Sequence, residues 1–202
     1  MQAAELDSRD HRLIQIVDAA MAEAARRAGP WLVCRLGCTQ CCIGPFPITQ
    51  LDARRLRRGL TELEAQDPER SRRVRARARD YVARLSEDFP GDPATGMLDE
   101  TAEGEKRFET FAEDEPCPAL DPETGGCDLY SARPLTCRTF GPPTLADEAL
   151  AVCELCFEGA TDAEIESCAV DYDPDHLESA LDDDLAKLGA PAGQTIVAFC
   201  LR

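Results

Sequence analysis

The chain has 202 residues, of which 44% are hydrophobic, 5% are aromatic and 11 are cysteines. This length fits one domain with a packed core, and so few aromatic residues leave that core mainly to Leu, Val, Ile and Ala. The formal net charge of −17 at pH 7 argues against a nucleic-acid partner, because phosphate binding needs a positive surface.

The sequence carries no pattern for export or for membrane insertion. Residues 1–10 are polar, and no stretch approaches the roughly 18 uninterrupted apolar residues that a spanning helix needs. We therefore expect a cytoplasmic protein with no membrane partner. In that reducing compartment, an odd number of cysteines favours metal ligation over a framework of disulfides.

Charge is distributed unevenly along the chain. Residues 54–84 carry eleven arginines, whereas residues 139–186 carry fourteen Asp or Glu and no Lys or Arg. We expect the two segments to neutralise each other in part within one fold. The alternative is that the arginine-rich segment is a docking surface for an anionic partner, which could be a protein.

Three helices are predicted in the first half of the chain. Apolar residues recur on one face of 9–28 and of 68–86. A third helix is expected over 49–59, which opens with Thr-x-x-Asp. Thr49 is the expected N-cap of the helix over 49–59 and Asp67 that of the helix over 68–86, because their side-chain oxygens can accept from the first free backbone amides.

The middle of the chain, 87–128, is rich in Gly, Pro and acidic residues, so only short extended pieces are expected there. We place these pieces at Arg107–Phe111 and Cys127–Tyr130. A short helix after Arg133-Pro134 is expected to carry Cys137.

The C-terminal third is predicted to be helical over 145–159, 161–169 and 174–188, with a closing strand or helical turn over Gln194–Leu201. The predicted fold class is therefore mostly α with small irregular or β elements, around a metal-stapled cysteine-rich core. We expect one domain, which has three parts: a metal-binding cysteine core, 34–143, and two packing helical segments, 1–30 and 144–202.

Seven cysteines form two sequence clusters. The first has four cysteines within nine residues and the second has three at even spacing: Cys34, Cys38, Cys41 and Cys42, then Cys117, Cys127 and Cys137. On a helix the first four would share one face, and a loop leading into a short helix would also bring them together. Thiolates at this density are best stabilised by a metal ion, which shares their negative charge.

Spacing also limits how these thiols can act. Cys41 and Cys42 are adjacent and rarely reach one tetrahedral ion together, so one of them can serve a second metal, bridge or simply pack. The nine-residue gaps in the second cluster are unlike a zinc ribbon. Arg133 and Arg138 flank Cys137 and would stabilise thiolate charge, unless they form surface salt bridges with the acidic middle segment.

Four cysteines remain. The pair Cys153-x-x-Cys156 is expected in a helix, where its spacing suits a metal and a core face equally well. Cys168 and Cys200 are expected to be small buried hydrophobic residues. The two histidines lie in polar helical sequence and are not expected to be ligands.

Taken jointly, these motifs resemble a known family. The matching residues are Cys34 before Cys38-x-x-Cys41-Cys42, then Pro47-Ile48-Thr49-x-x-Asp52, Cys117-Pro-x-Leu120 and Gly126-Cys127-x-x-Tyr130-x-x-Arg133-Pro134-x-x-Cys137-Arg138-x-Phe140. The pattern, over about 34–60 and 116–143, resembles the bacterial zinc- or iron-chelating cysteine-cluster family, which is named for its CxxCxxCC run and includes the flagellin N-methylases. Two departures are the three-residue gap after Cys34 and Gly141 in place of proline.

The resemblance implies a bacterial protein that holds an iron–sulfur cluster such as 4Fe–4S, in preference to zinc. We expect such a protein to serve electron transfer or metal handling. A cluster-dependent, methylase-like protein-modifying enzyme and a zinc-stabilised interaction module are the alternatives. No S-adenosylmethionine site can be placed on this sequence. The resemblance implies seven of the metal ligands, and Cys153 and Cys156 complete the predicted set: Cys34, Cys38, Cys41, Cys42, Cys117, Cys127, Cys137, Cys153 and Cys156.

Overall fold

The computed structural model describes residues 3–35, 37–146 and 149–202. Helices make up 54% of the structure, and the strands form two small antiparallel two-stranded sheets, which confirms the prediction of a mostly α fold with small β elements. The chain divides into two compact units: Met1–Arg35 with Leu135–Gly189 (unit 1), and Leu36–Pro134 with Ala190–Arg202 (unit 2). The expected cysteine core therefore contributes residues to both units.

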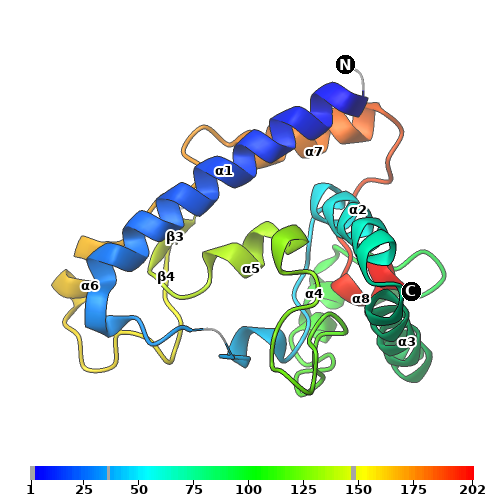
Figure 1. Cartoon of the computed structure of the whole chain (residues 1–202), viewed down its shortest axis with the longest axis horizontal. Helices are drawn as coiled ribbons and strands as arrows, with labels where there is room; N and C mark the ends of the chain where they lie inside the picture. The colour runs from blue at the N-terminus through cyan, green and yellow to red at the C-terminus, as the bar shows by residue number, and fades with distance from the viewer. Residues whose placement is uncertain (1–2, 36, 147–148) are drawn as a thin grey trace. The chain divides into compact units, whose positions relative to one another are not determined.

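Unit 2 is built on three helices that pack against one another: α2 (Gln50–Gln66), α3 (Pro68–Leu85) and α8 (Val197–Leu201). Figure 1 shows α2 and α3 side by side, with the short C-terminal helix against both. Their facing sides bury a continuous apolar cluster that includes Ile48, Leu56, Leu60, Val74, Ala78, Leu129 and Leu201. Cys117 and Cys127 pack against this cluster, so the helices support the thiols directly.

The two long helices of unit 2 begin where capping chemistry predicts. The Thr49 hydroxyl accepts from the backbone amide of Asp52, and the Asp67 carboxylate accepts from the amide of Arg70. Each bond satisfies an amide that has no partner within its own helix. Both predicted N-caps are confirmed, and α2 continues past the expected end at Gly59.

Short elements complete unit 2. They are η2 (Gln40–Cys42), β1 (Gly91–Asp92), β2 (Met97–Leu98), α4 (Ala102–Phe108) and η3 (Tyr130–Ala132). The extended piece expected at Arg107–Phe111 is wrong, because α4 covers its start. The Thr101 hydroxyl accepts from the amide of Gly104 and caps this helix, whose first turn is acidic and last turn basic. The extended piece expected at Cys127–Tyr130 is reduced to one β-bridge between Cys127 and Leu120.

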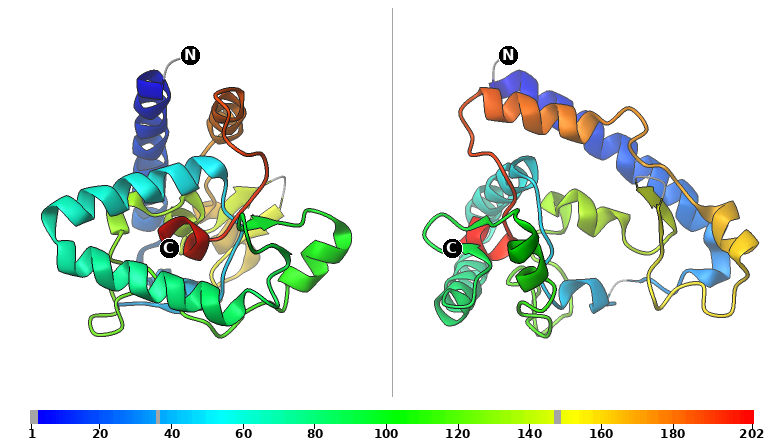
Figure 2. Two further views of the ribbon diagram at one scale, coloured as in Figure 1. Left: turned by 90° about the vertical axis from the view of Figure 1, so that its right-hand side faces the viewer. Right: turned by 180° about the vertical axis from the view of Figure 1, so that it is seen from behind.

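Unit 1 is also mostly helical, and its longest helix runs alongside a second one (Figures 1 and 2). Its elements are α1 (Ala3–Ala28), η1 (Gly29–Trp31), α5 (Leu135–Thr139), β3 (Thr144–Ala146), β4 (Ala149–Ala151), α6 (Asp162–Cys168) and α7 (Leu177–Lys187). Leu13, Val17, Leu181 and Leu185 are buried, as the periodicity of α1 and α7 predicts. The short helix that carries Cys137 is confirmed as α5.

The helix expected over 145–159 is wrong. Its first part is an antiparallel hairpin in which Leu145 lies opposite Leu150, and Cys153 and Cys156 follow in irregular turns. The hairpin is extended by a parallel bridge from Thr144 to Val170. Pairing with such a distant residue overrides local helical preference, and local sequence does not reveal it.

Several arginines of the arginine-rich segment form ion pairs with carboxylates of unit 2. Arg84 binds Glu115 and Asp80, with N–O distances of 2.8 and 2.9 Å, and Arg70 and Arg77 both bind Asp128. These ion pairs lie within one unit, and the expected pairing with the acidic segment 139–186 stays a prediction.

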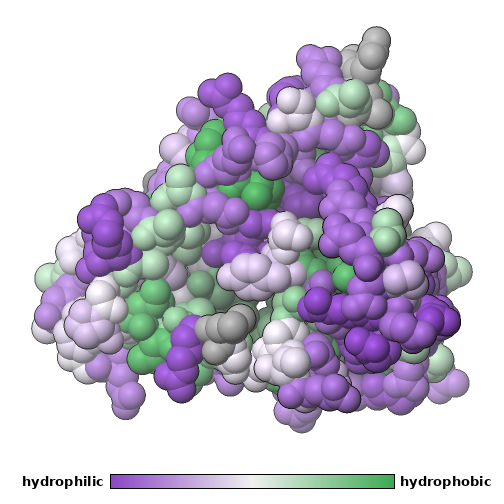
Figure 3. Space-filling view, in the orientation of Figure 1, coloured by the Kyte–Doolittle hydropathy of each residue, from purple (hydrophilic) through white to green (hydrophobic). Residues whose placement is uncertain are grey.

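The visible surface is dominated by hydrophilic residues. In Figure 3, hydrophilic residues (purple) cover most of this face, and smaller hydrophobic areas (green) lie between the hydrophilic ones. Within the described residues, no helix combines the length and apolar character that crossing a membrane requires.

Candidate metal centre

The first cysteine run does not form a regular α-helix. Cys41 and Cys42 lie in the single 3-10 turn η2, which a loop containing Cys38 precedes. This is the second of the two arrangements that the sequence allows, a loop leading into a short helix. All three side chains are partly exposed.

Backbone pairing joins this turn to the segment that carries Cys117. The amide of Cys117 donates to the carbonyl of Cys42 at 2.7 Å, and the amide of Gly44 donates to the carbonyl of Glu115 at 2.9 Å. Ile43 and Pro116 form the antiparallel bridge between these bonds. Two cysteines that are 75 positions apart in sequence, Cys42 and Cys117, are therefore held by neighbouring backbone groups.

A tight loop brings Cys127 to the same place. The Asp121 amide donates to the Gly126 carbonyl at 2.8 Å, and the Asp121 carboxylate accepts from the Thr124 hydroxyl at 2.7 Å. Gly125, with φ of +68°, lies where a Cβ would be 3.7 Å from a Thr39 methyl carbon. The loop before Cys127 therefore packs on the loop that contains Cys38. We call Cys38, Cys41, Cys42, Cys117 and Cys127 the central thiols.

Without a metal, three central thiols have raised pKa values and hold their protons at neutral pH. The pKa of Cys41 is raised first by its hydrogen bond with Cys42 and then by burial. Burial raises the pKa of Cys117 to about 12, with a further contribution from Cys127. Burial also raises the pKa of Cys127, and Asp128 adds to this effect. A metal cation would replace these protons and neutralise the thiolates.

Three arginines already provide positive charge around these thiols. Arg133 lies near both Cys41 and Cys127 and lowers the pKa of each, and its guanidinium lies 3.8 Å from the centroid of the Tyr130 ring. Arg70 acts in the same way on Cys127, and Arg77 acts on Cys117. Guanidinium groups in such positions stabilise anionic metal–sulfur centres.

Arg70 and Arg77 were not identified by sequence reasoning, although a signal was present. The two arginines are seven residues apart on α3, so they share a face, and both bind the buried carboxylate of Asp128, which directly follows Cys127. This carboxylate therefore holds two cations against the thiols. Arg138 is buried and binds Asp18 of α1 at 2.8 Å. This salt bridge is therefore not with the acidic middle segment, as the alternative proposed.

The remaining predicted ligands belong to unit 1. Backbone amides of Val33 and Cys34 donate to the thiol of Cys156, whose pKa is raised first by burial and also by Cys153. We call Cys34, Cys153 and Cys156 the unit 1 thiols. Cys137 lies on α5 in the same unit.

The two cysteines that were expected to be core residues are buried. Cys168 packs in one apolar cluster with Cys156 and Phe157, and Cys200 packs in the core of unit 2. Burial raises the pKa of Cys200 to about 12.

All eleven cysteines are described and are free thiols. Among the described residues, no group of three or more Cys, His, Asp or Glu side chains is already arranged to hold a metal ion. The structure thus gathers the cysteine-bearing segments within each unit and pairs their thiols without closing a coordination shell. Thiols with arginines beside them are a donor set that fits a zinc ion or an iron–sulfur cluster.

Comparison with known families agrees with this interpretation. The sequence model of the CxxCxxCC family, described as "Putative zinc- or iron-chelating domain", matches residues 33–157. The chain belongs to this family. Neither the curated proteins nor the solved structures gave a match.

Proposed function

We propose that the central thiols bind a metal centre, and that this centre is an iron–sulfur cluster in preference to zinc. Four thiolates satisfy either one [4Fe–4S] cluster or one tetrahedral zinc ion, and five central thiols are present. The proposed role is electron transfer or metal handling in a bacterial cell.

The observation that carries this proposal is the position of Arg133. Its charge acts on Cys41 and on Cys127, although these two residues come from segments far apart in the sequence. Because one cation lowers the pKa of both thiols, both can be ligands of a single anionic metal centre. The family membership adds zinc or iron as the metal.

The unit 1 thiols are proposed as ligands of a second metal. Amide groups of Val33 and Cys34 that donate to the Cys156 sulfur are the type of hydrogen bond that stabilises a metal-bound thiolate. Cys137 is kept as a further candidate ligand. These assignments rest on the sequence pattern and on the thiol pairing within unit 1.

A methylase-like enzyme is the less favoured reading, because its cosubstrate needs a large site. The hollow beside Cys153, lined also by Thr136, Thr139 and Phe140, measures about 170 Å³. An engineered cavity of about 150 Å³ accepts benzene, so a hollow of this size gives no support to a nucleoside-sized cosubstrate.

Anaerobic purification followed by elemental analysis and a visible spectrum tests the proposal. Brown protein with iron and acid-labile sulfide would support the cluster, whereas colourless protein with zinc would support the zinc-stabilised module. Adjacent Cys41 and Cys42 rarely bind one ion together, so only three usable thiolates remain without Cys127. Cys127→Ser should therefore abolish metal retention, and the matched control Cys168→Ser should retain it. Full metal content in Cys127→Ser would contradict the assignment of this ligand.

A further inference from the structure

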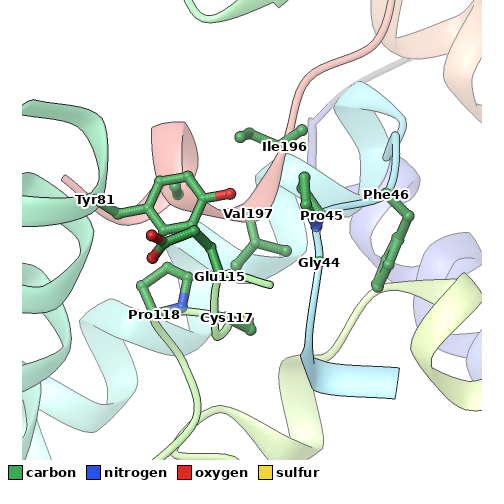
Figure 4. A pocket seen from close by; sticks show the side chains of 10 residues that line it. Gly44, Pro45, Phe46, Tyr81, Glu115, Cys117, Pro118, Ile196 and Val197 are labelled. Carbon is green, nitrogen blue, oxygen red and sulfur yellow. The ribbon is translucent and has the colours of Figure 1, made fainter. Parts of the chain in front are cut away.

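A small cavity in unit 2 connects Cys117 with the inner face of α3. It measures about 20 Å³, and its walls are mostly apolar side chains such as Pro45, Ile196 and Val197. Three polar side chains also line it, those of Tyr81, Glu115 and Cys117 (Figure 4). A candidate metal ligand and two other polar residues therefore line the same small cavity.

The Tyr81 hydroxyl is the unusual group in this cavity. The side chain is 4% exposed, and no described protein group forms a hydrogen bond with its hydroxyl oxygen. Figure 4 shows the ring extending from α3 with its hydroxyl directed into the pocket. Burial first, and then Glu115 and Cys117, raise the pKa of Tyr81, so the hydroxyl remains a donor.

A buried hydroxyl without a hydrogen-bond partner is energetically costly. The cavity is large enough to hold a water molecule that would supply this partner. A space of about 10–15 Å³ or more holds one water molecule when two to four polar partners are available. Glu115 keeps its negative charge because Arg84 binds it through both carboxylate oxygens at 2.8 and 2.9 Å. The sulfur of Cys117, which lines the same cavity, can accept from such a water.

We propose that this cavity is a binding site for one water molecule, which accepts from the Tyr81 hydroxyl and donates to the sulfur of Cys117. Tyr81 is then a positioning residue that acts on Cys117 through the water. The inference rests on the proposed function, because it matters most when that sulfur is a metal-bound thiolate. A hydrogen bond to such a sulfur reduces its electron donation to the metal and fixes its orientation.

Cobalt(II) and zinc(II) are suitable probes, because four thiolates bind both ions and cobalt reports sulfur ligation in its charge-transfer absorption. We would compare wild type, Tyr81→Phe and Ser71→Ala. Ser71 is the matched control, since its hydroxyl also lies buried on α3 with no described partner, yet Ser71 does not line the cavity. Chelator competition would give each metal affinity.

Tyr81→Phe should bind the same number of cobalt ions as wild type. Its affinity should be about tenfold weaker, as is typical for loss of an outer hydrogen-bonding partner, and its sulfur-to-cobalt band should move to longer wavelength. Ser71→Ala should change neither. Unchanged affinity and band position in Tyr81→Phe would overturn the inference, as would equal effects in both variants. Wild-type protein that shows no sulfur-to-cobalt band would instead overturn the proposed function.

Discussion

The central thiols of unit 2 and the unit 1 thiols are the same chemical group in two different environments. Around the central thiols, Arg70, Arg77 and Arg133 supply positive charge. Around the unit 1 thiols, Cys153 and Cys156 belong to an apolar cluster in which Trp31 and Phe157 stack with ring centroids 6.4 Å apart. The positive charge around the central thiols therefore makes unit 2 the stronger candidate for a metal site, although cysteines are gathered in both units.

The largest expected effect separates these two groups by metal content. The double variant Cys117→Ser/Cys127→Ser should lose the metal of the central thiols completely, because three thiols cannot close the proposed shell. Elemental analysis of the purified protein would measure this loss. The counterpart is Cys153→Ser/Cys156→Ser, which should keep the central metal and lose at most a second equivalent. The reverse pattern would assign the main site to unit 1.

A smaller effect is expected from the charge at Arg133. Arg133→Gln should weaken metal affinity about tenfold, since the cation near Cys41 and Cys127 no longer balances the thiolates. Competition with a chelator measures the change. Arg133→Lys should recover part of the affinity.

The control for Arg133 is Arg72→Gln, which removes an exposed arginine of the same unit that pairs with Glu69. Its metal affinity should match that of wild type. Equal losses in the Gln variants of Arg133 and Arg72 would indicate that only the overall charge of unit 2 matters.

The smallest effect concerns Cys200, a thiol of unit 2 that packs in the core. Its pKa is raised from 9.0 to about 12 by burial, so the folded protein keeps a proton that the unfolded chain releases above pH 9. Stability from this group is complete below pH 9 and is lost as the pH rises towards 12. The loss for the metal-free protein approaches about 1.4 kcal/mol per pH unit.

Urea unfolding of metal-free wild type and Cys200→Ala at pH 8 and pH 10 would measure this loss. The methyl side chain of alanine leaves a space whose cost does not depend on pH, so the difference between the two proteins should narrow at pH 10. A constant difference would show that Cys200 ionises normally in the fold.

Much of the helical fold was predictable because its signals are local. The side chains of Thr49 and Asp67 mark the starts of α2 and α3, because each accepts from the amide three residues later. Thr161 marks the start of α6 through a capping box with Glu164. The hairpin at Leu145 and Leu150 was not predictable, because β3 pairs with β4 and also, through Thr144, with the distant Val170.

The candidate site divides in a similar way. Cysteine spacing identified the thiols, and the motif around Arg133 identified one nearby cation. The seven-residue spacing puts Arg70 and Arg77 on one face of α3. Their binding to Asp128 and the cavity at Tyr81 depend on where α3 packs, which spacing does not show. The sequence also does not indicate that Cys34, Cys137, Cys153 and Cys156 belong to a different unit from the central thiols.

Gly59 has no functional group, yet it sets how closely α2 approaches the turn η3. A Cβ on this residue would lie 2.2 Å from the methyl carbon of Ala132, the neighbour of Arg133. Any larger side chain would push the turn outward and carry the guanidinium with it. The absence of a side chain at Gly59 thereby helps to keep the Arg133 charge near Cys41 and Cys127.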